Sequence, residues 1–189
     1  MKIIGSAIRA GNIIEVDGRV YQVVKHNIVQ PGKGGAFNQI DMRDIKTGTK
    51  TNMKFRSDET AELLRVDEKE LQYLYHEGDQ YTFMDQESYE QVAVNRDLIG
   101  DAADFLVDNM MVTMDFLEGG GPVAVHLPAT SVHTVVEADA VVKGQTASSS
   151  YKPAVLDNGV RVMVPPFIGA GTRIVVKIEE REYVERAKD

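Results

Sequence analysis

Short runs of alternating apolar residues, separated by glycine-containing turns, constrain this chain more than any other feature. Ile13–Val16 and Val20–Val24 flank Asp17-Gly18, a dipeptide typical of two-residue hairpins. Similar turn sequences recur at Thr47-Gly48, Glu77-Gly78-Asp79, Gly119–Pro122 and Asp157-Asn158-Gly159. Because such short strands pair most readily across their turns, the pattern predicts an all-β fold built from antiparallel hairpins.

The strand runs fall into three groups, and 189 residues are enough for three small barrels in series. Residues 1–64 form a meander sufficient for one barrel, with residues 57–64 expected as a link or a short helical turn. Residues 65–128 add one helix, expected over 96–105 with Asn95 as its cap, and are compatible with an OB-like barrel. Residues 129–189 repeat the strand pattern without a clear sequence repeat.

The charges are distributed unevenly over these three parts. Residues 1–64 hold 10 Lys and Arg against 7 Asp and Glu, residues 65–128 hold 3 against 14, and residues 129–189 hold 8 against 8. A net charge of −8 argues against a simple nucleic-acid binder. The asymmetry leaves two explanations open: a multi-domain protein whose first part faces polyanions, or an acidic middle part that keeps the protein soluble.

Several kinds of chemistry have no support in the residues. The chain has no cysteine, its four histidines lack metal-ligand spacing, and the middle aspartates lack the EF-hand pattern. His126 and His133 lie in apolar runs and are expected to be structural. Without a base–nucleophile constellation, the sequence predicts a protein that is not an enzyme and needs no metal or cofactor. The N-terminus has no signal-peptide pattern and no stretch approaches about 20 apolar residues, so we expect a cytoplasmic protein without membrane contact.

One loop stands out, because Pro31-Gly32-Lys33-Gly34-Gly35-Ala36 places a single lysine among three glycines between two strand runs. Pro31 presets a turn, Gly32 allows a positive φ, and Gly34 and Gly35 leave the stem of Lys33 free. The spacing alone leaves two explanations open. The loop is either a flexible tip with a solubilising lysine, or a probe that presents Lys33 to a polyanionic crevice or a modifying enzyme.

Basic residues in the same third of the chain are candidate RNA contacts: Lys25, Arg43, Lys54 and Arg56. A free-standing RNA-binding OB-fold protein is therefore one alternative, although aromatic residues make up only 7% of the chain. An enzyme with a lysine nucleophile is another, but it needs a desolvated lysine, and a glycine-flanked loop does not supply one.

Three motifs together give the chain a family resemblance: Pro31–Ala36, Gly78-Asp-Gln-Tyr-Thr-Phe-Met-Asp85, and Lys152–Gly159 followed by Val164-Pro-Pro-Phe-Ile168. With them the chain resembles bacterial translation elongation factor P along nearly its whole length, up to Arg186. The resemblance implies an N-terminal KOW/SH3-like barrel over residues 1–64, and OB-fold barrels over 65–128 and 129–189. It also implies an overall L shape similar to tRNA.

The resemblance further implies a function. Members of this family bind the 70S ribosome between the peptidyl-tRNA and exit sites, acting as monomers, and relieve stalling at consecutive prolines. By position, Lys33 is the residue that points toward the peptidyl-transferase centre. In many members this residue receives a covalent modification, for example β-lysylation, from a separate lysine-modifying enzyme.

The closing segment departs from the family pattern. Tyr183 and Arg186 match it and become candidate RNA contacts, with barrel packing as the other explanation for Tyr183. Arg181, however, stands where the family has glycine. This ending resembles the elongation-factor-P-like paralogue, which stays open as an alternative at this point.

Overall fold

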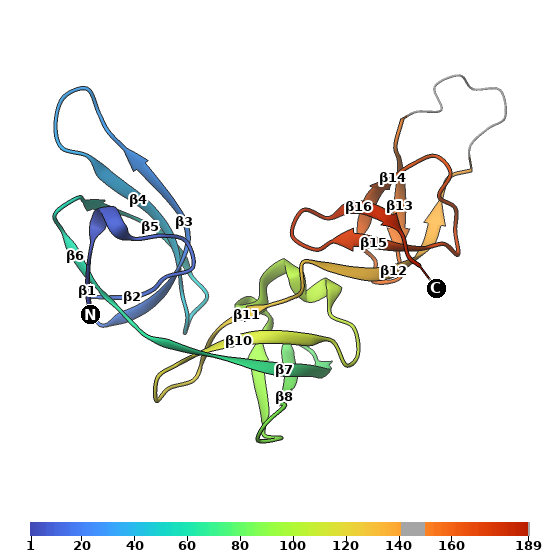
Figure 1. Ribbon diagram of the computed structural model, residues 1–189, viewed down its shortest axis with the longest axis horizontal. Coiled ribbons are helices and arrows are strands. Elements are labelled where there is room, and N and C mark those ends of the chain that lie inside the picture. Colours follow the sequence, from blue (N-terminus) through green and yellow to red (C-terminus); the bar gives the residue numbers. More distant parts are fainter. Residues whose placement is uncertain (141–149, 189) are drawn as a thin grey trace.

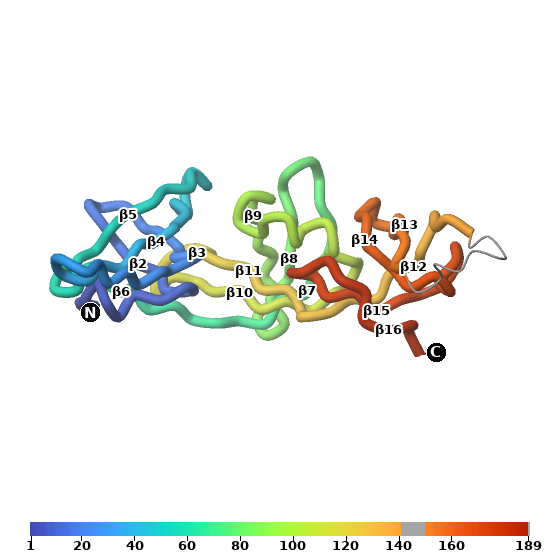
Figure 2. Tube along the Cα trace, turned by 90° about the horizontal axis from the view of Figure 1, so that it is seen from above, coloured from blue at the N-terminus to red at the C-terminus, as the bar shows by residue number. Residues whose placement is uncertain are grey.

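The computed structural model describes residues 1–140 and 150–188. It confirms the all-β fold, with three antiparallel sheets that follow one another in a bent row (Figure 1). The first and third barrels lie at the two ends, and the middle barrel lies at the bend. Seen from above, the three barrels are spread along the long axis of the molecule (Figure 2).

The first sheet has six strands in the order β1-β6-β2-β3-β4-β5. Its elements are β1 Lys2–Ile4, the 3-10 turn η1 Gly5–Ala7, β2 Ile13–Val16, β3 Arg19–Val29, β4 Phe37–Asp44, β5 Lys50–Arg56 and β6 Thr60–Leu63. The predicted hairpin turn joins β2 to β3, and both of its residues have positive φ, 52° at Asp17 and 77° at Gly18. These are the backbone angles that two-residue hairpin turns require.

The expectation of a link or helical turn over residues 57–64 is wrong, because β6 is a strand of the sheet. It pairs with β1 on one side and with β2 on the other, and Ala61 enters the core. Ala, Glu and Leu are good helix formers, which explains the misleading local signal. Hydrogen bonds to two neighbouring strands outweigh that weak preference.

The middle and third barrels share one strand order. The middle sheet runs β11-β10-β7-β8-β9, and the third runs β14-β13-β12-β15-β16, so the first strand of each unit is central. The middle elements are β7 Val66–Glu77, β8 Gln80–Asp85, β9 Gln91–Asn95, α1 Arg96–Ile99, the 3-10 segment η2 Gly100–Phe105, β10 Met111–Leu117 and β11 Pro122–His126. The third set is β12 Thr130–Ala138, β13 Lys152–Leu156, β14 Arg161–Val164, β15 Arg173–Lys177 and β16 Glu182–Arg186.

The predicted helix over residues 96–105 is present but divided. Asn95 caps it, since its Oδ1 accepts a hydrogen bond from the Asp97 amide at 2.9 Å. The α-helix ends at Ile99 because Gly100, with φ of 78°, leaves the helical conformation, and the chain continues as 3-10 turns to Phe105. The sequence therefore placed this segment correctly and missed the break within it.

Each barrel has its own apolar core, and a fully buried residue of the middle barrel lies in the core of the third. Ile14, Ile40 and Met42 lie in the first core, and Phe83 lies in the second. Phe105 belongs by sequence to the middle barrel, yet its side chain lies in the core of the third. The middle and third barrels are therefore joined by buried apolar contact as well as by the chain.

Candidate functional site

The glycine-rich loop lies at the end of a long hairpin. β3 and β4 pair from Val29 opposite Phe37 down to Tyr21 opposite Asp44, and their loop reaches an outer extremity of the molecule (Figure 1). Lys33 is exposed, and none of the ion pairs within residues 1–140 and 150–188 includes it. The fold thus presents the Lys33 ammonium outward.

The glycines of the tip act differently from the sequence-based expectation. The positive φ is at Gly34, 104°, and Gly32 does not use the conformational freedom that a glycine allows. A Cβ atom added at Gly32, Gly34 or Gly35 would meet no described atom within 4 Å. The fold needs glycine for backbone reasons only at Gly34, so what the other two glycines provide is a narrow tip.

A buried amide anchors the base of the tip hairpin. The Asn38 side chain, the second residue of β4, donates from Nδ2 to the carbonyls of Gly5 at 2.9 Å and Ile8 at 3.0 Å. These carbonyls belong to the N-terminal turn η1 and the residue that follows it. Because both bonds are buried, they hold the start of β4 against the barrel and limit sideways movement of the hairpin.

Three of the predicted basic contacts lie on one face of the first sheet. In the β3–β4–β5 register, Lys25 is opposite Asp41, Lys54 opposite Gln39, and Arg56 opposite Phe37. Residues 37, 39 and 41 alternate with the buried positions 38, 40 and 42, so this face is the outer one. The structure therefore brings Lys25, Lys54 and Arg56 together on the surface that leads to the tip.

Arg43 lies on the same outer face of β4 but near the end of the strand away from the tip, where the middle barrel meets it. Its guanidinium donates to the carbonyls of Asp97 and of Leu98, the latter at 3.1 Å, across the junction with the middle barrel. It also donates to Gln22 Oε1 at 2.9 Å. Burial lowers the pKa of Arg43, and the nearby charge of Asp97 acts in the opposite direction. With its donors engaged in this way, Arg43 contacts protein where the sequence suggested RNA.

Tyr183 and Arg186, the two candidates in the third barrel, each lie beside an aromatic ring that sequence reasoning missed. The Tyr183 ring is half-buried and meets the Tyr151 ring edge-on, with centroids 6.5 Å apart. The Arg186 guanidinium lies 5.2 Å from the centre of the exposed Phe167 ring. Phe167 directly follows Pro165-Pro166, where a turn is expected. An aromatic residue at such a position was the sequence signal that could have identified it as a candidate contact.

Tyr183 also packs against the core of the third barrel. The half-buried ring of Tyr183 thus packs on the barrel and also remains partly accessible, so its position fits both explanations given above. Along the molecule, this surface belongs to the opposite end from the Lys33 tip (Figure 1).

The two histidines expected to be structural differ from each other. His133 is buried, with Nε2 2.7 Å from Ser131 Oγ and Nδ1 3.1 Å from Asp157 Oδ1, which fits that expectation. His126 is exposed and lies 2.8 Å from Asp115 Oδ2, so it is a surface residue. Over the described ranges, no group of three or more His, Cys, Asp or Glu side chains has the geometry of a metal site. None of the helices in those ranges has the length and apolar character that crossing a bilayer requires.

A carboxylate shapes the turn between β4 and β5, where the first barrel approaches the middle one. Asp44 Oδ1 accepts from the amides of Lys46 at 2.8 Å and Thr47 at 3.2 Å. These bonds, the Lys46 amide first, lower the pKa of Asp44. Gly48, in the same turn, approaches so closely that an added Cβ would lie 3.3 Å from Asp97 Cβ.

This lowered pKa predicts a pH dependence for the first barrel. Since folding favours the charged form of Asp44, its stabilisation is present above the unfolded pKa of about 4 and is lost as pH falls through the lower folded value. We expect urea midpoints for the first barrel, followed by NMR, to fall between pH 5 and pH 3. The Asp44→Asn variant keeps an acceptor oxygen and should show a flatter dependence. If the urea midpoint fell equally steeply with pH in both proteins, the acid sensitivity would come from other carboxylates.

Three family models match the chain in sequence order. They are described as the elongation factor P KOW-like domain over residues 5–61, the elongation factor P OB domain over 66–125, and the elongation factor P C-terminal domain over 132–186. The matches agree with the three sheets, whose strands span residues 2–63, 66–126 and 130–186.

Full-length relatives agree with these models. The chain is 58% identical to elongation factor P of Rhodospirillum centenum over all of both chains, and 56% identical to that of Zymomonas mobilis over 99% of this chain and all of the relative. Their names favour elongation factor P itself over the paralogue. Among solved structures, translation initiation factor 5A from Methanococcus jannaschii matches with a TM-score of 0.50 and 20% identity, over 68% of this chain and 94% of that one. This last likeness concerns the fold alone.

Proposed function

Because the chain belongs to the elongation factor P family, and is thereby a translation elongation factor, we propose that it relieves ribosomes stalled at consecutive prolines. In this proposal the protein binds the 70S ribosome between the peptidyl-tRNA and exit sites, as a cytoplasmic monomer. It stimulates peptide-bond formation there without catalytic chemistry of its own.

The observation that carries the proposal is the presentation of Lys33. The lysine is exposed at the end of a projecting hairpin, and the flanking glycines have open space where side chains would be. A solubilising lysine would not need a tip this narrow, since larger residues would fit at Gly32 and Gly35. A narrow tip is useful where the lysine must enter a confined, RNA-lined space such as the peptidyl-transferase centre.

The mechanism we propose is positional. The proline ring fixes φ and makes proline an awkward partner in peptide transfer. A cation held beside the end of the peptidyl-tRNA would favour the reacting geometry and lower the entropic part of the barrier. Lys33 would act as this cation, either unmodified or after extension by a lysine-modifying enzyme, for example through β-lysylation. No general acid or base is needed for this role.

The remaining surfaces have supporting roles in the proposal. Lys25, Lys54 and Arg56, on the outer face that leads to the tip, would contact phosphates of ribosomal RNA or tRNA. Tyr183 and Arg186 would contact RNA at the other end of the molecule. The acidic middle part, with 14 Asp and Glu against 3 Lys and Arg, would limit unspecific binding to RNA backbones.

A reconstituted translation system tests the proposal. Adding the protein should accelerate synthesis through three consecutive proline codons and leave a matched message without prolines unchanged. Binding should be measured in parallel to 70S ribosomes and to short single-stranded RNA. Acceleration together with ribosome binding supports the proposal. Tight binding to free single-stranded RNA without acceleration would instead favour a free-standing RNA-binding protein.

A further inference from the structure

The ten residues Arg96–Phe105 of the middle barrel, which we call the hub segment, receive one arginine from each flanking barrel. Helix α1 is so short that its last carbonyls have no partner within the helix. Those of Asp97 and Leu98 accept hydrogen bonds from Arg43 of the first barrel. The end of α1 is thereby satisfied by a neighbouring barrel.

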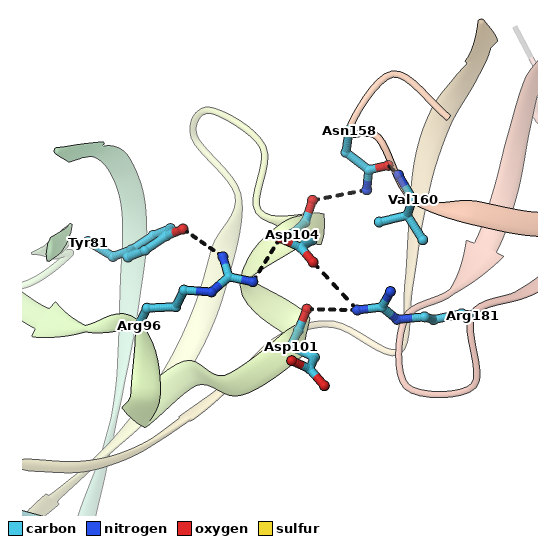
Figure 3. A network of polar contacts seen from close by, with 7 residues as sticks. All are labelled: Tyr81, Arg96, Asp101, Asp104, Asn158, Val160 and Arg181. Atoms are coloured by element: carbon cyan, nitrogen blue, oxygen red, sulfur yellow. Dashed lines mark hydrogen bonds and ion pairs between the residues drawn. The ribbon is translucent and has the colours of Figure 1, made fainter. Parts of the chain in front are cut away.

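The other half of the hub segment faces the third barrel. Arg181 Nη2 donates to the Asp101 carbonyl at 3.2 Å and lies 3.5 Å from Asp104 Oδ2, while Asn158 Nδ2 donates to the Asp104 carbonyl at 2.9 Å (Figure 3). Asp104 is itself fixed by Arg96, whose Nη2 lies 2.9 Å from Oδ1. The result is a continuous polar network across this second junction.

Arg181 makes its interdomain contacts from an unfavourable backbone conformation. Its φ of 54° is in the left-handed region, which disfavours residues other than glycine. A glycine would relieve the backbone but remove both contacts to the hub segment. It would also remove the guanidinium that lies 5.5 Å from the centre of the Phe105 ring. The unfavourable backbone conformation of Arg181 thus accompanies three interdomain contacts that glycine could not make.

We propose that the hub segment sets the angles of both flanking barrels, with Arg43 and Arg181 as its positioning residues. Barrels joined by a chain and a few contacts are expected to move relative to one another, even where one buried ring, Phe105, crosses the second junction. Two arginines that dock on one short segment remove that freedom on both sides of the middle barrel. If the proposed function holds, the consequence is a fixed span between Lys33 and the Tyr183–Arg186 surface.

Distances between spin labels in the free protein test this proposal without the ribosome. Because the chain has no cysteine, labels attach only to introduced ones. Glu15→Cys with Glu87→Cys reports on the first junction, and Glu87→Cys with Met163→Cys reports on the second. Arg181→Gly should broaden the second distance distribution by about twofold and leave the first unchanged. Arg43→Gln should have the reverse effect.

Matched variants separate docking from general destabilisation. Tyr89→Gly relieves the same left-handed strain at an exposed position of the middle barrel, φ 61°, and should change neither distribution. Arg19→Gln makes the same chemical change as Arg43→Gln at an exposed site of the same sheet, and should also be silent. Arg181→Lys keeps the charge but loses the planar fork, so an intermediate width is expected.

Unchanged distributions in Arg181→Gly and Arg43→Gln, with thermal unfolding showing intact barrels, would overturn the proposal. Broadening of both distributions by either variant would overturn it as well, because each arginine is assigned to one junction only. These outcomes are independent of the translation assay. If the protein did not relieve stalling in the translation assay but the label distances changed as expected, the proposed function would be contradicted and the positioning role of the hub segment would still be supported.

Discussion

Replacing Lys33 with alanine should leave all three barrels folded and remove the effect of the protein on consecutive-proline stalling. The side chain is exposed and forms no ion pair within the described ranges, so its loss costs the fold little. If Lys33 holds the reacting geometry, its removal should slow synthesis through three prolines by roughly a hundredfold relative to the native factor. The measurement is the rate of full-length product in the reconstituted system.

Two companion proteins make this result specific. Lys2→Ala removes an exposed lysine from the same barrel, far along the sheet from the tip, and should retain full stimulation. Ribosome binding of Lys33→Ala should weaken less than its stimulation, because the basic outer face of the first sheet remains. Undiminished relief of stalling by Lys33→Ala would refute the positional role of the lysine.

The sequence predicted the features of the fold that depend on local chemistry. Turn dipeptides such as Asp17-Gly18 specify their own backbone angles, so they located the hairpins correctly. The capping oxygen of Asn95 and the apolar spacing behind it located the helical segment. Three glycines around one lysine made Lys33 a candidate, although spacing alone left a solubilising role open.

Features that depend on distant contacts were outside the reach of spacing and composition. Residues 57–64 have a helical composition, and only pairing with β1 and β2 makes Thr60–Leu63 a strand. Arg43 looks like any other basic residue of the first barrel, and its partners lie 54 and 55 residues away along the chain. Arg181 was recognisable as a departure from the family pattern, but the carbonyl and carboxylate that receive it belong to another barrel.

The same reasoning applies to Phe105, whose burial in the core of the third barrel has no local signal. A phenylalanine at the end of a helical pattern is expected to pack on its own helix and sheet. The ring lies instead among the side chains of β12–β15 and meets His133 edge-on, with centroids 5.4 Å apart. The junction between the two barrels therefore has an apolar anchor beneath the polar network of Arg181 and Asp104.

Phe105→Ala should consequently destabilise a barrel to which the residue does not belong by sequence. The ring is fully buried, so its removal leaves a cavity and should lower the free energy of unfolding of the third barrel by about 3–5 kcal/mol. Hydrogen exchange followed by NMR measures this barrel by barrel, and amides of β12–β16 should lose protection in the variant. Phe83→Ala is the matched control, because it removes an equally buried ring from the core of the middle barrel alone. That variant should lower protection in β7–β11, and a Phe105→Ala protein that did the same while sparing β12–β16 would show that the ring supports only its own barrel.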